Sequence, residues 1–467
     1  MIQMTSSVMI DPRAEIANAF SHRLRPGTPT ARGPFLPICD RRARTRRMIL
    51  VGVLALMLLA CQSCPLWRAD AIAAPTPEAK PNASNAAVSV GLKLLPGSTK
   101  KIEQLIADFD RVTQQPTLSR TEERFGIIGT DLGASFEHDG KLYFLFGDTI
   151  DRAGTGDAIA TTDASSGDAG VRLDFVRGPG ERWLKVSPPG VSMGTNEVPL
   201  AGVSIGGKIY LMVRTNRAEG RSQGADIAKL VRFEPDARRF EVLRDVSRLP
   251  QGRFVQVSLH HATKPIRGLP SQGPAVLMWG TGAYRKSNAY LAVTPAESLT
   301  TGQGTRYFAG LDAAGEPMWA SDEARAVQLF DQPTIGDLSV SFVPQLGLWV
   351  MLYDAWPGRP DRPDAGIQLR TSPTPWGPWS AAESVLRPVE AARGKLIHMA
   401  NTDDGLEWPI KKFNGASRSS EQGAIYAPYV IERFTRVEGD RLKLYYTLST
   451  WNPYVVMLMR SEFTIVR

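Results

Sequence analysis

The sequence predicts an all-β protein folded as a five-bladed β-propeller, because one two-strand pattern recurs along the chain. Three stretches carry a leading acid, an alternating strand, a turn and an apolar strand with an aromatic residue: Gly129 to Thr149, Thr195 to Thr215 and Gly336 to Asp354. Pro274 to Thr281 and Leu442 to Thr450 repeat the second strand alone. The steps between successive second strands are 67, 68, 71 and 96 residues. Five sheet units at this period indicate a radial repeat, and a five-bladed propeller is the simplest architecture that fits.

The first unit illustrates how the pattern produces a hairpin. Apolar and polar residues alternate after Asp131, the pair Asp139-Gly140 favours a tight turn, and Leu142 to Phe146 returns as a β-rich run. Asp148 follows this second strand. Antiparallel pairing therefore brings Asp131 and Asp148 to the same end of the sheet.

A targeting leader precedes the repeats. Arg41 to Arg47 is basic, and Met48 to Ala60 is an apolar run of 13 residues, too short for a permanent membrane helix and suited to a signal peptide. The run ends in Leu-Leu-Ala before Cys61 and resembles a bacterial lipobox. We predict that Cys61 is acylated after export across the inner membrane and anchors the protein in the bacterial cell envelope. An uncleaved anchor or ordinary secretion is the alternative.

Three segments divide the chain: the leader with its lipoprotein signal peptide at 1–60, a flexible tether at 61–95 and the propeller domain at 96–467. The tether is rich in Ala, Pro, Ser and Asn, a composition typical of flexible linkers. Beyond it, Lys100 to Val112 carries apolar residues at helical spacing, which predicts one short amphipathic helix. We expect this helix to pack on the outside of the propeller, and binding to a partner is the alternative.

Most of the positive charge lies in the leader. The formal net charge is +8, and residues 1–60 hold nine arginines against three acids, so the rest of the chain is close to neutral. A near-neutral domain argues against nucleic-acid binding. All three cysteines, Cys39, Cys61 and Cys64, precede the repeats, which leaves the propeller without an internal disulfide or a thiolate metal site. We expect a monomer that needs no cofactor or metal and meets the membrane only through its lipid.

Two segments near the repeats invite other interpretations. Asp151 to Gly170 contains four acids but no EF-hand spacing, which predicts a solvated loop rather than a calcium site. His260 and His261 lie near the end of Val255 to Pro265, the predicted inner strand of the third unit. Adjacent residues on a strand point to opposite faces, so we expect no metal pair and take His260 as a candidate substrate contact.

Several motifs, in a fixed order, resemble one family. They are GTDLGASFEHDGKLYFLFGDT, GDLSVSFVPQLGLWVMLY, IYAPYVIERFT and LYYTLSTWNPY, and the similarity extends from about Phe125 to the C-terminus. The chain resembles the family catalogued as domain of unknown function 4185 (DUF4185). The resemblance implies a five-bladed propeller. Some members of that family are glycoside hydrolases that cut D-arabinan inside the chain.

The leading acids of the three complete repeats are the candidate catalytic residues. Propellers place the start of each inner strand around a central funnel, so Asp131, Glu197 and Asp337 could converge there. Glycoside cleavage needs one protonated carboxyl group to assist the leaving oxygen and one ionised group as base or nucleophile. Carboxyl groups that converge raise one another's pKa, as a general acid requires. The structural alternative is that each acid caps a strand or binds backbone N–H groups in its own turn.

Further residues near strand ends are candidates for substrate binding, and each has a structural alternative: Asp148, His260, Asp354, Tyr426, Trp451 and Asn452. The two aspartates could orient a sugar hydroxyl or a catalytic partner. The aromatic residues and the asparagine could stack on a sugar and hydrogen-bond to it. No phosphate-binding glycine loop, GxSxG elbow, HExxH motif or catalytic cysteine in the domain points to a different chemistry.

The sequence therefore predicts an extracytoplasmic lipoprotein that hydrolyses a polysaccharide, and the family resemblance suggests D-arabinan. The alternative is a non-catalytic propeller that binds a glycan or an envelope protein. The two hypotheses differ in whether a shortened oligosaccharide is formed.

Overall fold

The computed structural model of the protein describes residues 90–467 except 179, 181, 217–225, 359–360 and 409–420. The predicted signal peptide, Cys61 and the tether up to residue 89 lie outside the described residues. Across the part of the chain that is described, no helix has the length and apolar character needed to cross a membrane.

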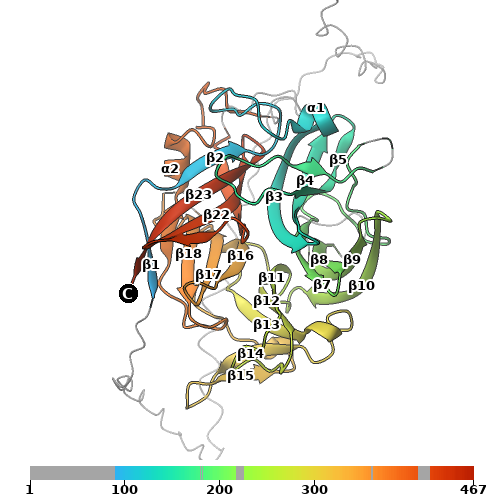
Figure 1. The fold of residues 1–467 in the computed structure, drawn as a ribbon, viewed down its shortest axis with the longest axis vertical. Helices are drawn as coiled ribbons and strands as arrows, with labels where there is room; N and C mark the ends of the chain where they lie inside the picture. Colours follow the sequence, from blue (N-terminus) through green and yellow to red (C-terminus); the bar gives the residue numbers. More distant parts are fainter. Residues whose placement is uncertain (1–89, 179, 181, 217–225, 359–360, 409–420) are drawn as a thin grey trace, which may run out of the picture. The chain divides into compact units, whose positions relative to one another are not determined.

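Five antiparallel sheets, here called blades, follow one another in sequence order around a common centre (Figure 1). Blade 1 contains β3 (Ile127–His138), β4 (Lys141–Asp151), β5 (Gly154–Thr162) and β6 (Asp174–Phe175). Blade 2 contains β7 (Pro199–Ile205), β8 (Lys208–Thr215), β9 (Ile227–Glu234) and β10 (Arg239–Arg248). Blade 3 contains β11 (Gln256–Ala262), β12 (Ala275–Thr281), β13 (Tyr290–Pro295), β14 (Arg306–Leu311) and β15 (Pro317–Ala320).

Blades 4 and 5 complete the circle. Blade 4 contains β16 (Ile335–Val343), β17 (Leu348–Ala355), β18 (Gly366–Ser372) and β19 (Glu383–Leu386). Blade 5 contains β20 (Ala424–Val430), β21 (Arg436–Glu438), β22 (Arg441–Trp451) and β23 (Val455–Val466), together with two strands from the other end of the domain.

The first strand of each blade lines the centre of the ring. Neighbouring inner strands contact one another in the order β3, β7, β11, β16 and β20, and β20 contacts β3. The ring is therefore closed, and the predicted five-bladed propeller is confirmed. The repeated sequence pattern forms the inner hairpin of its blade, in which Phe136 faces Tyr143 and, in blade 4, Phe342 faces Trp349.

Blade 5 joins the two ends of the domain. β1 (Gly91–Leu94) and β2 (Lys100–Gln104) both pair with β23. The helix predicted over Lys100–Val112 is therefore wrong, and the segment predicted as tether ends in a strand. The edge of β23 offers backbone hydrogen bonds, and this pairing overrides the helical spacing of the apolar residues. The α-helices among the described residues are short: α1 (Thr121–Phe125) and α2 (Pro388–Arg393).

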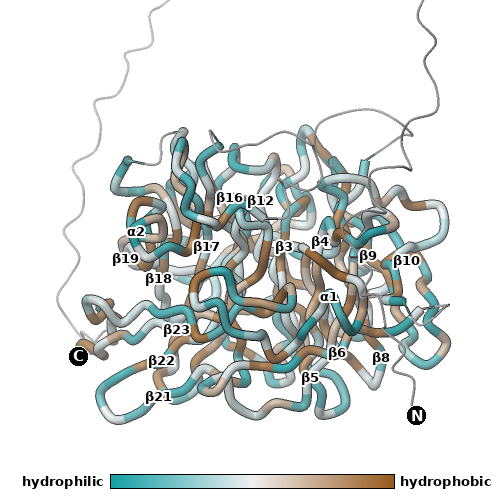
Figure 2. The backbone as a smooth tube through the Cα atoms, turned by 90° about the horizontal axis from the view of Figure 1, so that it is seen from above, coloured by the Kyte–Doolittle hydropathy of each residue, from teal (hydrophilic) through white to brown (hydrophobic). Residues whose placement is uncertain are grey.

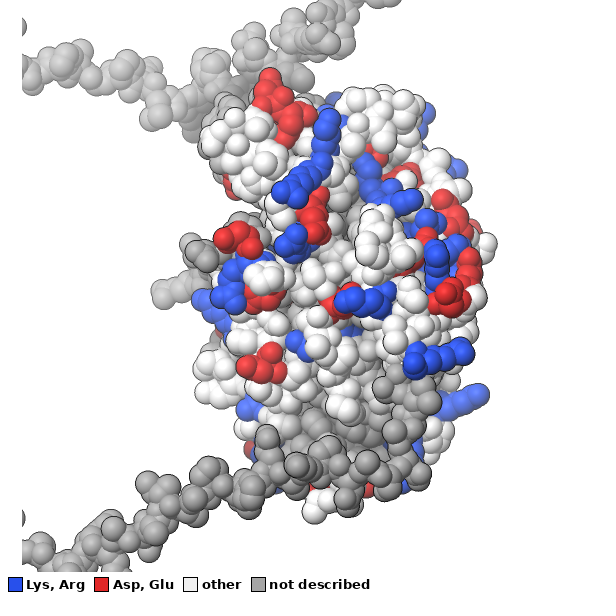
Figure 3. Space-filling view, turned by 90° about the vertical axis from the view of Figure 1, so that its left-hand side faces the viewer, with Lys and Arg blue, Asp and Glu red and all other residues white. Residues whose placement is uncertain are grey.

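Hydrophobic side chains fill the space within and between blades. The rings of Phe136 and Tyr143 stack with centroids 5.3 Å apart inside blade 1, and Trp279 of blade 3 meets Trp349 of blade 4 at 5.1 Å. Aromatic contacts of this kind add specific geometry to a large buried apolar area. Apolar colours follow the strands in Figure 2, whereas hydrophilic colours are prominent in the connections. On the face drawn in Figure 3, side chains of both charge signs are interspersed.

The acidic segment Asp151–Gly170 contains a strand. Its middle part is β5, which pairs with β4 and buries Ala158, Ile159 and Ala160. The prediction of a solvated loop is therefore wrong over these residues. Three consecutive small or apolar residues pack against the centre of blade 1, and the acids on either side had obscured this signal.

Candidate active site

A cavity of about 560 Å³ lies at the end of the ring where the inner strands begin. Its wall takes residues from all five blades or their connections, among them Asp131, Asp148, Arg214, Tyr284, Asp337 and Tyr426. The structure therefore brings Asp131 and Asp337, two of the three predicted catalytic acids, to one cavity. It also places Asp148, predicted as a substrate contact, beside them.

Asp131 lies on β3 at an irregular part of the ladder, opposite Gly147. The Tyr426 hydroxyl donates a hydrogen bond of 2.9 Å to its Oδ2 atom, and its buried Oδ1 atom has no hydrogen-bond partner among the described residues. Gly147 permits this approach, since a Cβ atom there would lie 2.9 Å from Oδ1 and 2.7 Å from Val198 Cγ1. Burial, and then the neighbouring Asp148 carboxylate, hold the pKa of Asp131 well above its ordinary value.

Asp148 lies on β4 with φ at 41°, a left-handed conformation. The backbone N–H of Asn196 donates to its carboxylate at 2.9 Å, and the Tyr454 hydroxyl donates to its backbone carbonyl at 3.2 Å. Burial raises the pKa of Asp148, while the Asn196 N–H group and the Arg214 guanidinium lower it. Asp148 is thus the less strongly shifted of the two acids of this hairpin.

Asp337 lies at the start of the inner strand of blade 4 and is 1% exposed. The hydroxyls of Tyr284 and Tyr429 donate to it at 3.1 and 3.2 Å, and the Gln256 side-chain amide donates to the same oxygen as Tyr429. A carboxylate can only accept hydrogen bonds, and this one receives three. Its oxygens are therefore more fully engaged by the protein than those of Asp131.

Asp354 does not belong to the cavity wall. Its Oδ1 atom accepts the backbone N–H of Asp337 at 2.7 Å, and its Oδ2 atom lies 3.5 Å from Arg285 Nη2. Burial raises the pKa of Asp354 to about 6, against the opposing effect of Arg285. Asp354, predicted as a substrate contact, is therefore a buried carboxyl group that holds the backbone N–H of Asp337.

Glu197 also points away from the cavity. Its carboxylate accepts from the Ser192 hydroxyl and the Gly194 N–H, each at 2.5 Å, and from the Asn216 N–H at 2.8 Å. It is 2% exposed and is not part of the cavity wall. The structure thus does not bring Glu197 together with the other two predicted catalytic acids. Its bonds match the alternative in which the acid binds N–H groups of its own turn.

The other candidates near β20 and β22 also divide into residues that line the cavity and a residue that does not. Tyr426 and Trp451 line the cavity, and Tyr454, which the sequence reasoning missed, lies against Trp451 with ring centroids 5.6 Å apart. Asn452 is fully buried and donates to the Glu421 carbonyl at 2.9 Å, away from the cavity wall.

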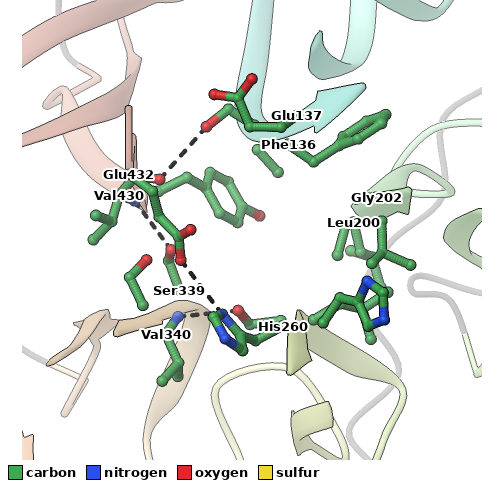
Figure 4. Close-up of a pocket in the computed structure, with 18 of the residues that line it drawn as sticks. Phe136, Glu137, Leu200, Gly202, His260, Ser339, Val340, Val430 and Glu432 are labelled. Carbon is green, nitrogen blue, oxygen red and sulfur yellow. Dashed lines mark hydrogen bonds and ion pairs between the residues drawn. The ribbon is translucent and has the colours of Figure 1, made fainter. Parts of the chain in front are cut away.

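His260 lies at the other end of the ring. A second cavity of about 250 Å³ opens where the inner strands end, and Figure 4 shows His260, Ser339 and Glu432 around it. His260 Nδ1 is 3.5 Å from Glu432 Oε1, and the histidine ring meets Trp349 edge-on at 4.9 Å. Tyr429 also lines this cavity, while its hydroxyl bonds to Asp337 of the first one. The structure therefore separates His260 from the acids with which it was grouped.

Comparison with protein families gives a match over most of the chain. The profile of DUF4185, a domain of unknown function, matches residues 117–460. The chain belongs to the DUF4185 family. A comparison with curated proteins gives no match.

Several solved structures are similar to the DUF4185 chain at low sequence identity. A protein of Bacteroides ovatus ATCC 8483 has 10% identity and a TM-score of 0.47, covering 79% of this chain and 93% of its own. A thermostable family-43 glycoside hydrolase has 14% identity and a TM-score of 0.37, covering 73% and 94%. An exo-1,5-alpha-L-arabinanase from a bovine ruminal metagenomic library has 12% identity and a TM-score of 0.36, covering 73% and 98%.

Two arginines balance the acids of the DUF4185 cavity. Arg214 donates to Gln256 Oε1 at 2.6 Å and to the Asn196 carbonyl at 3.0 Å, so it is fixed in place. The Arg285 guanidinium stacks over Tyr284 at 4.8 Å. Both arginines and Tyr284 were missed, because residues on strand ends and connections carry no periodic signal.

The arrangement of the DUF4185 cavity suits acid–base chemistry. It presents one carboxyl group whose pKa is strongly raised and a second whose pKa burial raises less, because an N–H group and an arginine oppose the effect of burial. Such a pair of unequal acids is what proton donation and proton acceptance at one bond require. Among the described residues, no group of three or more His, Cys, Asp or Glu side chains is arranged to hold a metal ion.

Proposed function

We propose that this DUF4185 protein is a glycoside hydrolase and that Asp131 and Asp148 are its catalytic pair. The observation that carries the proposal is that both acids come from one hairpin, line one cavity and have unequal pKa shifts. Two carboxyl groups in unlike states flanking a glycosidic bond are the common requirement of glycoside hydrolysis. The substrate is a polysaccharide, and the family resemblance makes D-arabinan the first one to test.

Asp131 is assigned as the general acid. The proton is held on the Asp131 carboxyl group, whose Oδ2 atom accepts the Tyr426 hydroxyl and whose side chain lines the cavity. This proton passes to the glycosidic oxygen as the bond between that oxygen and the anomeric carbon breaks. Since Asp131 must be protonated beforehand, its raised pKa is the property that suits it to this step.

Asp148 is assigned as the ionised partner. Its carboxylate either takes a proton from the water that attacks the anomeric carbon or attacks that carbon itself. Burial raises the pKa of Asp148, and the Asn196 N–H and Arg214 oppose this effect, so that the ionised form needed by both routes is less disfavoured than in Asp131. Asp337 adds a third carboxyl group to the cavity wall, where Tyr284, Tyr429 and Gln256 hold it by hydrogen bonds. Tyr426 and Trp451 offer aromatic faces for sugar contact.

A product assay tests the assignment. The protein is incubated with D-arabinan and a panel of other envelope and plant polysaccharides, and released oligosaccharides are separated and counted. We expect wild type to shorten at least one polymer and Asp131→Asn to form no product above background while keeping its melting temperature. If the wild-type protein binds a glycan but releases no oligosaccharide, this result would contradict the hydrolase assignment and favour a carbohydrate-binding propeller.

We also propose that the protein acts outside the cytoplasm, held to the membrane by lipid on Cys61. The support is the order of basic flank, apolar run and Leu-Leu-Ala-Cys in the sequence. Mass spectrometry of the membrane-extracted protein should find an acylated cysteine at its N-terminus. Recovery of an unmodified chain that begins before Cys61 would contradict the anchor.

A further inference from the structure

Asp157 is a buried carboxyl group next to the proposed pair with no assigned task. It lies on β5 and is 1% exposed. Its Oδ1 atom accepts the backbone N–H of Asp148 at 2.9 Å. Its Oδ2 atom is buried and has no hydrogen-bond partner among the described residues. Asp157 therefore accepts a hydrogen bond from the backbone of a proposed catalytic residue, while its own side chain does not line the cavity.

Asp148 needs this contact because the ladder between β4 and β5 is interrupted at its position. Phe146 pairs with Ala158 and Thr149 with Gly156, so two residues of β4, Gly147 and Asp148, face the single residue Asp157. This is the geometry of a β-bulge, which redirects a side chain at the expense of regular ladder bonds. Asp148 also adopts a left-handed backbone conformation, with φ at 41°, and the surroundings must offset the strain of that conformation.

The same device occurs a second time in the molecule. In blade 4, Asp354 on β17 accepts the backbone N–H of Asp337 through Oδ1 at 2.7 Å. There, too, the strand that carries the supported acid is irregular, since the register shifts between Ile335 and Leu338. Two unrelated positions thus use a buried aspartate on the adjacent strand to hold the amide of an acid that lines the cavity.

We propose that Asp157 is a positioning residue for Asp148, whose amide it holds so that the left-handed backbone turns the Asp148 carboxylate into the cavity. The proposal rests on the proposed function of that cavity. Asp157 performs this task as a neutral acid that accepts through one oxygen. Burial, and then the neighbouring Asp148, keep the pKa of Asp157 well above its ordinary value, in agreement with this state.

Two substitutions separate positioning from a charge effect or a packing effect. Asp157→Asn keeps an acceptor oxygen on a neutral side chain, so we expect kcat close to wild type. Asp157→Ala removes the acceptor, and a displacement of the Asp148 carboxylate by about 1 Å should lower kcat by about 100-fold. KM should change little, because the aromatic cavity wall is untouched. Asp163→Ala, an exposed acid just beyond β5, is the matched control and should leave kcat unchanged.

The kcat values of the two Asp157 variants decide whether Asp157 is a positioning residue. Wild-type kcat in Asp157→Ala, or an equal loss in both Asp157 variants, would overturn the proposal. If Asp157→Ala fails to fold, the kcat of Asp157→Asn still tests the neutral acceptor. If wild type cleaves no glycan, the proposed function has failed, and crystal structures of wild type and the folded Asp157 variants test the geometry alone. Positioning then predicts an unmoved Asp148 in Asp157→Asn and a displaced one in Asp157→Ala, and any other result overturns it.

Discussion

Blades 1 and 4 begin with the same sequence pattern and use it differently. Asp131 and Asp148 are 17 residues apart, and so are Asp337 and Asp354. In blade 1 both aspartates line the cavity, whereas in blade 4 the first lines it and the second lies behind the first. Equivalent acids in two copies of one repeat are therefore divided between a candidate catalytic role and a supporting one.

The difference begins at Gly133, whose counterpart in blade 4 is Ser339. Gly133 has φ at 106°, and the register of β3 against β4 shifts there, so that Asp131 faces Gly147. In blade 4 the ladder is regular from Val343 back to Leu338, which faces Tyr353, and its register shifts only nearer the start of the strand, between Leu338 and Ile335. A single extra residue in one strand changes which side chains reach the cavity. Sequence spacing therefore places acids at the correct end of a blade, while a bulge decides which of them face the cavity.

Asp148→Asn should have the largest effect on function. Asparagine adopts the left-handed conformation readily and keeps the side-chain shape, so the fold should be intact. Loss of the ionised carboxylate should lower kcat by about 10³-fold. The measurement is the initial rate of oligosaccharide release, with Asp163→Asn as the control. A variant with half of the wild-type rate would remove Asp148 from the catalytic pair and leave blades 1 and 4 without the proposed functional difference.

Asp354→Ala should instead act on stability. The substitution removes the partner of Arg285 and leaves the amides of Asp337 and Ala427 without their acceptor. Breaking a buried pair from one side should lower the free energy of unfolding by about 3 to 5 kcal/mol, measured by urea denaturation. The control is Asp364→Ala in the same blade, which removes a surface pair with Arg362 and should change stability little. Equal stability of the two variants would contradict the supporting role.

The sequence predicted the blades because their signals are local. Alternating strands and glycine turns depend only on neighbouring residues, their recurrence gives the repeat period, and the structure confirms the blades they predict. Lys100–Gln104 was predicted wrongly because its strand partner, β23, is more than 350 residues away in the chain.

The site was predicted in part, for a related reason. The position of an acid in the repeat indicates which end of the ring it occupies, which was correct for Asp131 and Asp337. Whether its carboxylate then turns inward depends on bulges and loop N–H groups, which decided the outcome for Asp148 and Glu197. Asp157 was missed because its strand was read as a loop.

Gly133→Ser tests the bulge directly by giving blade 1 the residue of blade 4. A serine at φ 106° is strained, and its Cβ atom would lie 3.2 Å from Thr447. We expect the strain to lower the free energy of unfolding by about 1 to 3 kcal/mol. We also expect kcat to fall, because Asp131 lies beside the bulge. The reciprocal Ser339→Gly should lose stability without loss of turnover. Unchanged turnover in Gly133→Ser would show that the bulge does not control the cavity acids.

Tyr426→Phe should have the smallest effect, and its sign identifies the proton donor. The Tyr426 hydroxyl lowers the pKa of Asp131, so its removal should raise that pKa further. A general acid must be protonated, and activity is lost as the pH rises through its pKa. The alkaline limb of the profile of kcat against pH should therefore move to higher pH. At the optimal pH, kcat should fall by about tenfold, which corresponds to about 1.4 kcal/mol for the loss of one hydrogen bond. Tyr429→Phe removes a bond to Asp337 in blade 4 and should leave that limb in place. An alkaline limb that moves only in Tyr429→Phe would assign the proton donor to blade 4 and reverse the roles of the two blades.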